Sequence, residues 1–127
     1  MSVNKEEITI RKFEEKDIPN KVKWINDNNN NSYLHYNLPL TIKETTNWYK
    51  NIKNMQSRYD AIIEYKNIPV GVIGLINIDK CKGEYYITLG ECNYKRKGIS
   101  YIASKKIINY GFSELGLNKI WLCVDSD

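Results

Sequence analysis

The sequence predicts an α/β (α+β) fold in which helices flank a mixed, mainly antiparallel sheet. Residues 61–65 and 70–78 are rich in β-branched side chains and lie only four residues apart, which predicts an antiparallel hairpin. Apolar residues then recur at helical spacing from Ile99 to Leu115, and the apolar residues 119–124 follow. A strand, a crossover helix and a further strand are typical of a sheet that also contains a parallel pair.

The N-terminal part predicts one strand, one helix and a long loop. Residues 8–13 begin with alternating apolar and polar side chains, as in a strand with one buried face. Asp17 is expected to cap a helix that runs to about Trp24 or Ile25, because apolar side chains recur along one face. Residues 26–40 are rich in Asn and have no sustained period, so we expect a loop there.

A second helix and a third central strand complete the predicted order. Thr41 and Glu44 fit a capping box, in which the hydroxyl and the carboxylate each satisfy a backbone N–H at a helix start. The helix is expected to reach about Asn54. Its predicted buried stripe consists of Ile42, Thr45, Tyr49, Ile52 and Met55. With a strand at residues 84–91, the order becomes β-α-α-β-β-β-α-β within one domain covering residues 1–127.

Composition limits the class of protein. Apolar residues make up 42% and charged residues 27%, as in ordinary folded proteins, and no apolar run is long enough to cross a bilayer. With no signal-like start, we expect a cytoplasmic protein without a membrane partner.

The three cysteines, odd in number and without close pairs, predict free thiols and no metal site. A net charge of +4 favours an anionic ligand but is too small to predict nucleic-acid binding.

The most informative segment, residues 87–100, passes from a strand through a basic, glycine-containing turn into a helix. The first N–H groups of a helix have no intrahelical partner and lie at the positive end of its dipole, so they can hold a diphosphate. Lys95, Arg96 and Lys97 would add positive charge, and Gly98 would let the backbone approach closely. The alternative is a solvated helix start without a ligand.

This turn resembles the phosphate-binding motif of the GNAT superfamily of N-acetyltransferases, in which Gln or Arg is followed by two residues, Gly, one residue, and Gly or Ala. In residues 95–100, Lys95 replaces the usual Gln or Arg and Ser100 replaces the final Gly or Ala. The surroundings add to the likeness. Residues 67–74 look like the family's hairpin, and residues 107–120 resemble its helix-to-strand passage.

Residues near the N-terminus point to one subgroup, which includes ribosomal-protein and amino-sugar acetyltransferases. Arg11, Asp17 and residues 24–27 lie where this subgroup tends to have similar residues. The alternative for Asp17 is a plain helix cap, and for Trp24 it is a core or loop-packing residue, and we prefer the alternative in both cases.

The resemblance implies a GNAT-like fold, acetyl-CoA as cofactor and specific site residues. The backbone of Leu89, Gly90 and Glu91 would hold the pantetheine and the thioester carbonyl. The phosphates would be bound by Lys95, Arg96, Lys97, Gly98, Ile99 and Ser100. Glu84 or Glu91 is the candidate catalytic base, although a carboxylate on a strand is often simply solvated.

The expected acceptor is a primary amine, either on an amino-sugar nucleotide or at a protein N-terminus. His35, the only histidine, and its neighbour Tyr36 lie in the loop that borders the acceptor site in related enzymes, and a surface or packing role is the alternative. In the family a tyrosine acid, an asparagine, a helix and two strands follow the strand that here ends at residues 124–127. We therefore expect an open sheet edge and homo-oligomers formed through it.

Two other functions remain alternatives to an acetyltransferase. The first is a catalytically inactive CoA-binding or interaction module, which would also fit this pattern. The second is a basic nucleic-acid-binding domain, but the aromatic platform with interleaved basic residues that is usual in such domains is not evident.

Overall fold

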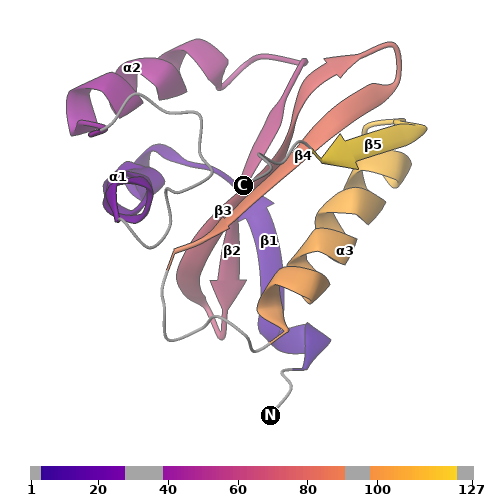
Figure 1. Cartoon of the computed structure of the whole chain (residues 1–127), viewed down its shortest axis with the longest axis horizontal. Helices are drawn as coiled ribbons and strands as arrows, with labels where there is room; N and C mark the ends of the chain where they lie inside the picture. Colours follow the sequence, from indigo (N-terminus) through magenta and orange to yellow (C-terminus); the bar gives the residue numbers. More distant parts are fainter. Residues whose placement is uncertain (1–3, 28–38, 91–97, 123–127) are drawn as a thin grey trace, which may run out of the picture.

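The computed structural model of the chain describes residues 4–27, 39–90 and 98–122, and these contain one five-stranded sheet with the strand order β1-β2-β3-β4-β5 (Figure 1). The strands are β1 (Ile8–Lys12), β2 (Tyr59–Tyr65), β3 (Ile68–Asp79), β4 (Lys82–Leu89) and β5 (Lys119–Leu122). The helices are α1 (Ile18–Asn26), α2 (Ile42–Ile52) and α3 (Ile99–Ser113), with short 3-10 turns η1 (Lys5–Glu7) and η2 (Glu15–Asp17). Neighbouring strands are antiparallel except β4 and β5, which are parallel. The predicted fold and element order are confirmed.

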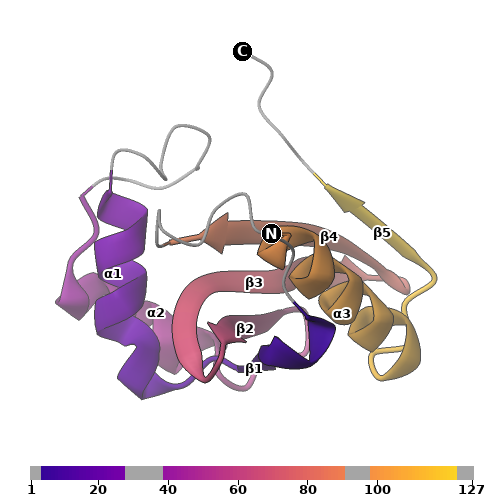
Figure 2. The same cartoon turned by 90° about the horizontal axis from the view of Figure 1, so that it is seen from below.

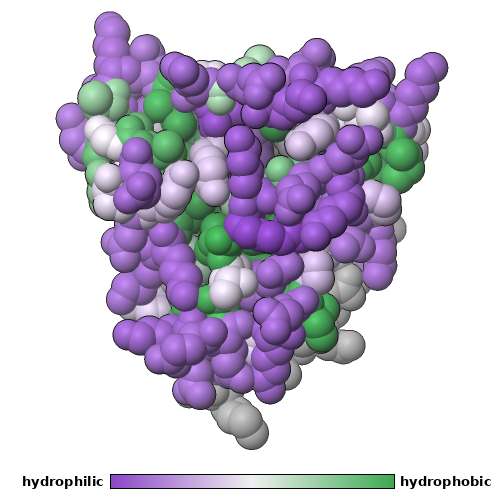
Figure 3. Space-filling model, turned by 180° about the vertical axis from the view of Figure 1, so that it is seen from behind, coloured by the Kyte–Doolittle hydropathy of each residue, from purple (hydrophilic) through white to green (hydrophobic). Residues whose placement is uncertain are grey.

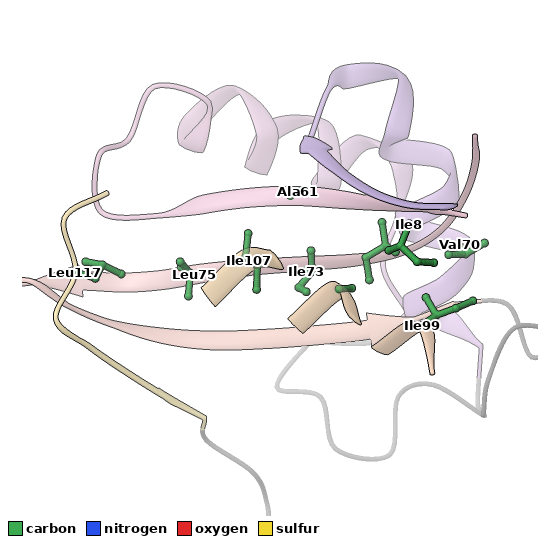
Figure 4. Close-up of a cluster of buried hydrophobic side chains, with 10 residues drawn as sticks. Ile8, Ala61, Val70, Ile73, Leu75, Ile99, Ile107 and Leu117 are labelled. Carbon is green, nitrogen blue, oxygen red and sulfur yellow. The ribbon is translucent and has the colours of Figure 1, made fainter. Parts of the chain in front are cut away.

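Helices cover both faces of the sheet (Figure 2). Alternate strand residues point to opposite faces, so each face has its own apolar cluster. One cluster joins the sheet to α3, and Figure 4 shows its side chains, including Ile8, Val70, Ile73, Ile99 and Ile107. The other cluster joins the sheet to α1 and α2 through Phe13, Ile18, Trp24, Ile62 and Val72. The face opposite the view of Figure 1 is largely hydrophilic, with small separate apolar patches (Figure 3).

The predicted hairpin is confirmed, but its turn is shorter than expected. Lys66 and Asn67 both have positive φ, 50° and 68°, as a two-residue type I′ turn requires. Ile68 and Pro69 already belong to β3. Pro69 is tolerated because the register shifts there through a bulge between Ile63 and Glu64, and a bulge does not need a ladder N–H from every residue.

Helix α2 begins as predicted, but only part of its predicted stripe is buried. The Thr41 hydroxyl accepts the Glu44 N–H at 3.0 Å, while the Glu44 carboxylate accepts the Thr41 hydroxyl rather than a backbone N–H. Ile42 and Met55, expected to be buried, are 49% and 47% exposed. Trp48 takes their place, because its ring meets Phe13 edge-on at a centroid distance of 5.4 Å and so shifts the packed face of the helix.

Asp17 is not the plain helix cap that we expected. Its side chain makes no cap hydrogen bond to α1. Instead, both carboxylate oxygens accept hydrogen bonds from Arg11 at 2.8 Å, and one also accepts the Glu14 N–H at 2.8 Å. Hydrogen bonding to Asp17 raises the pKa of Arg11. This 2% exposed carboxylate therefore joins the end of β1 to the start of α1.

Helix α3 differs slightly from the prediction. It ends at Ser113, before Leu115, and Gly116 then has a φ of 70°, as expected for a glycine just past a helix.

Strand β5 lies at the edge of the sheet. In the described part of the chain it pairs only with β4, so its other side forms an edge. No helix among the described residues combines the length and apolar character that a membrane span needs. Cys81 is a free, exposed thiol, and Cys92 and Cys123 lie outside the described residues.

Candidate active site

The candidate site lies at the C-terminal end of β4. Strand β4 pairs with β3 as far as Leu89, and the described part of β5 pairs with β4 from Lys82 to Tyr85. Figure 2 shows β4 and β5 side by side, with α3 on one face of the sheet. Backbone donors and acceptors at the end of a strand can bind an extended ligand where they are not used in a ladder.

The end of β4 is held closely by α1. The Gly90 N–H donates to the Val70 carbonyl at 2.7 Å, which continues the β3–β4 pairing by one residue. A Cβ atom at position 90 would lie only 2.1 Å from Cγ of Trp24, so the indole rests directly on the glycine backbone. Trp24 is 1% exposed, in agreement with the core role preferred from the sequence. Leu89 and Gly90 thus lie at this strand end, as predicted, and Glu91 falls outside the described residues.

Helix α3 begins at the same end of the sheet. Ile99 is buried in the cluster that contains Val70 and that Leu89 packs against, and Figure 4 shows Ile99 and Val70 at one end of it. Gly98 precedes the helix with a φ of 82°, and the space beside its Cα is empty to 4 Å. Ser100 is exposed. The structure therefore brings Gly98, Ile99 and Ser100 close to the end of β4.

Several predicted site residues lie outside the described residues, so the structure does not place them. These are Lys95, Arg96 and Lys97 of the basic turn, Glu91, and the acceptor residues His35 and Tyr36.

Glu84 lies where β4 pairs with both β3 and β5. It is the register partner of Trp121 in β5, and its carboxylate accepts a hydrogen bond from Asn77 Nδ2 at 3.1 Å. At roughly 3.3 Å per strand residue, it is about 17 Å along β4 from Leu89. Its role as a catalytic base stays a prediction, but it is not brought to the strand end where Leu89 and Gly90 lie.

A buried polar group that the sequence reasoning missed lies beneath the α1/α2 face of the sheet. Lys21 is only 4% exposed, and its Nζ lies 3.4 Å from the centre of the Trp48 ring. Burial lowers the pKa of Lys21 to about 8, although the negative charge of Asp60 acts in the opposite direction. Asp60 is itself buried and pairs with Arg58 at 2.7 Å. The sequence contains an indication of this burial, because Lys21 lies at helical spacing between Ile18 and Ile25 and therefore on the apolar face of α1.

Asp60 also contacts the strand that carries the candidate site. The Tyr86 hydroxyl donates to Asp60 Oδ1. Because Tyr86 belongs to β4, this bond links the buried polar group to the same strand that ends at Leu89.

A separate hollow of about 450 Å³ lies between β1 and α2. It is lined by Arg11, Lys12, Phe13, Glu14, Tyr49, Lys53 and Asn54. Strands β2 and β3 lie between β1 and β4, so this hollow is distinct from the candidate active site. Among the described residues, no cluster of three or more His, Cys, Asp or Glu side chains could hold a metal ion.

Comparison with known families identifies the class of protein. Residues 7–127 match the family described as Acetyltransferase (GNAT) domain, so the chain belongs to this family. The protein is accordingly an acetyltransferase, and acetyl-CoA is the co-substrate of the family. No curated protein sequence matches the chain significantly.

Solved structures show the same fold. A spermidine N-acetyltransferase from Vibrio cholerae in complex with CoA and spermine is similar to this chain with a TM-score of 0.85 at 21% sequence identity. The match covers 92% of this chain and 70% of that one. A dodecameric structure of spermidine N-acetyltransferase from the same organism, in an intermediate state, has a TM-score of 0.79 at 19% identity, with 92% and 69% covered. At such identities the likeness establishes the fold.

Proposed function

We propose that this chain transfers an acetyl group from acetyl-CoA to a primary amine at the end of β4. The observation that carries the proposal is the position of the first turn of α3 beside the end of β4, where the space next to Gly98 is empty to 4 Å. An extended thioester could lie along the end of β4 while its diphosphate meets the helix start.

Backbone groups and basic side chains would bind the cofactor. Backbone groups of Leu89, Gly90 and Glu91 would bind the pantetheine and orient the thioester carbonyl, and a fixed N–H donor there would stabilise the oxyanion of the tetrahedral intermediate. The amides that open α3 at Gly98, Ile99 and Ser100 would bind the diphosphate, because they lie at the positive end of the helix dipole. Lys95, Arg96 and Lys97 would add charge-assisted hydrogen bonds to the phosphates.

The reaction needs a neutral amine and a proton for the leaving group. The amine lone pair attacks the thioester carbonyl carbon, the C–S bond breaks, and the thiolate leaves to be protonated. Glu91 or Glu84 would remove the amine proton, directly or through a water molecule. Glu91 directly follows Gly90 in the sequence, whereas Glu84 lies about 17 Å along the strand, so we favour Glu91.

Three kinds of primary amine are candidate acceptors. The resemblance to the ribosomal-protein and amino-sugar subgroup supports a protein N-terminus or an amino-sugar nucleotide. The structural likeness to spermidine N-acetyltransferases adds a polyamine as the third. His35 and Tyr36 would contact the acceptor.

The test has two stages. Calorimetric titration with acetyl-CoA should show binding, and thiol release should then follow on addition of one acceptor from a panel of an amino-sugar nucleotide, a peptide with a free N-terminus, and spermidine. Binding without turnover by any of the three would favour the alternative, a CoA-binding module without catalysis. Failure to bind acetyl-CoA would refute both functions.

The assembly and location of the protein remain predictions from the sequence. The outer side of β5 is an edge in the described part of the chain, which supports association between copies through this edge. Light scattering behind size exclusion would test that proposal, and a monomer at all concentrations would contradict it. The expected cytoplasmic location would be tested by cell fractionation.

A further inference from the structure

The last turn of α1 contacts both the end of β4 and the segment that precedes α2. Trp24 packs on Gly90, at the end of β4. Asn26 hydrogen-bonds to Leu40, just before the start of α2. These two contacts come from one helical turn, so a single rigid element holds both segments.

The contact between Trp24 and Gly90 leaves no room for adjustment. A Cβ atom at position 90 would lie 2.1, 2.3 and 2.4 Å from three ring carbons of Trp24, well inside van der Waals contact. On its other side, Gly90 is held by the hydrogen bond from its N–H to the Val70 carbonyl at 2.7 Å. The end of β4 is therefore fixed between β3 and a fully buried indole.

The contact between Asn26 and Leu40 uses both polar atoms of one amide. Asn26 Nδ2 donates to the Leu40 carbonyl at 2.9 Å, and Asn26 Oδ1 accepts the Leu40 N–H at 2.7 Å. The side chain thus imitates the pairing of one strand residue with another. Among similar residues, Asp lacks the donor and Gln is one methylene longer, so Asn is the side chain that fits.

We infer that the last turn of α1 is a positioning element for acetyl transfer, in which Trp24 sets the end of β4 and Asn26 sets the segment at Leu40. The inference rests on the proposed function. Trp24 acts through the Gly90 backbone and therefore determines where the thioester is held. Asn26 acts through Leu40 on the acceptor side, because Leu40 ends the predicted loop that contains the candidate acceptor residues. Small displacements of a reacting group reduce rates strongly, which gives both contacts kinetic consequences.

The first test is Trp24→Phe, with Trp48→Phe as the matched control. Both changes remove indole atoms from the α1/α2 cluster, but only Trp24 touches the end of β4. We expect Trp24→Phe to weaken acetyl-CoA binding in calorimetry and to lower kcat/KM for acetyl-CoA by roughly 10- to 100-fold. Trp48→Phe should change stability without this kinetic effect. Equal effects of the two variants on acetyl-CoA affinity would overturn the role of Trp24.

A suppressor pair tests the contact itself. Gly90→Ala should lower acetyl-CoA affinity severely, because its methyl group would overlap the indole. Adding Trp24→Leu to Gly90→Ala makes room for that methyl group, so the double variant should bind acetyl-CoA better than Gly90→Ala alone. No recovery would show that the contact does not govern binding at this strand end.

The second test is Asn26→Asp, with Asn51→Asp on the exposed surface of α2 as the control for added charge. Asn26→Asp keeps the shape of the side chain but loses the donor to the Leu40 carbonyl. We expect the KM for the amine to rise about tenfold while acetyl-CoA affinity stays unchanged. A parallel loss of affinity for both substrates would refute a separate acceptor-side role. An unmodified protein that binds no acetyl-CoA would instead refute the proposed function.

Discussion

Lys21 shows how one residue links the packing of this protein to pH. It is buried on α1, close to the Trp48 ring and near both Asp60 and Arg58. Burial disfavours the charged ammonium, so the pKa falls from 10.5 to about 8. The protonated lysine is therefore less favourable in the folded protein than in the unfolded chain.

The sign of the resulting pH dependence follows directly. Between about pH 8 and pH 10.5 the unfolded chain binds more protons at Lys21 than the folded protein, so the free energy of unfolding should rise with pH. The full effect corresponds to about 3 kcal/mol, most of it reached by pH 9.5 or above. The raised pKa of Tyr59, about 12, opposes this trend only above pH 10, where the unfolded chain alone would ionise.

Urea denaturation from pH 7 to pH 9.5 would measure this contribution. Lys21→Met keeps an unbranched side chain and removes the titrating group. We expect the stability of the unmodified protein relative to Lys21→Met to increase over this range, most steeply above about pH 8. A constant difference would mean that the buried lysine does not titrate as described.

At the scale of elements, the joint between β1 and α1 depends on one ion pair. Arg11 on β1 makes two hydrogen bonds of 2.8 Å to Asp17, which ends η2 just before α1. It also contacts Glu64 on β2 at 3.0 Å and Glu14 at 3.3 Å. The Asp17 contacts are buried and short, whereas the Glu14 carboxylate is 55% exposed, so the two partners should differ in their effect on stability.

Paired amide substitutions should separate these two contributions. Asp17→Asn removes the charge but not the shape, and leaves Arg11 with a buried, poorly matched partner; we expect a loss of about 2 kcal/mol. Glu14→Gln should cost less than about 0.5 kcal/mol, because exposed ion pairs contribute little. Chemical denaturation of both variants would measure the contrast. Equal losses would contradict the assigned importance of the buried carboxylate.

For the whole molecule, binding of acetyl-CoA should couple the basic turn to global stability. A ligand that binds only the folded protein stabilises it in proportion to the logarithm of its concentration over its Kd. Lys95, Arg96 and Lys97 are proposed to bind the phosphates, so saturating acetyl-CoA should raise the melting temperature through them.

A charge-matched pair of triple variants would test this coupling. Lys95→Ala, Arg96→Ala and Lys97→Ala together should abolish most of the shift in melting temperature caused by acetyl-CoA, and should make the remainder less sensitive to salt. The control carries Lys16→Ala, Lys43→Ala and Lys50→Ala, three exposed lysines that remove the same charge elsewhere. An identical loss of the shift in both variants would point to net charge rather than a phosphate site.

The sequence by itself determined the element order, the hairpin that turns after Tyr65, the capped start of α2 at Thr41, and the buried face of α3. Each of these depends on side chains within a few residues of one another, where periodicity and backbone preference act directly. The resemblance to the GNAT family could also be recognised from the sequence, because the basic turn at Gly98 and the strand and helix around it are neighbours in the chain.

Only the tertiary structure decided which residues meet across the sheet. Three contacts join residues of different elements. Arg11 pairs with Asp17, Lys21 is buried near Asp60, and Trp24 packs on Gly90. The register of the parallel β4–β5 pair likewise depends on how two strands that are distant in the sequence lie side by side. Contacts of this kind are set by the packing of complete elements against each other, and no local pattern of residue types encodes that geometry.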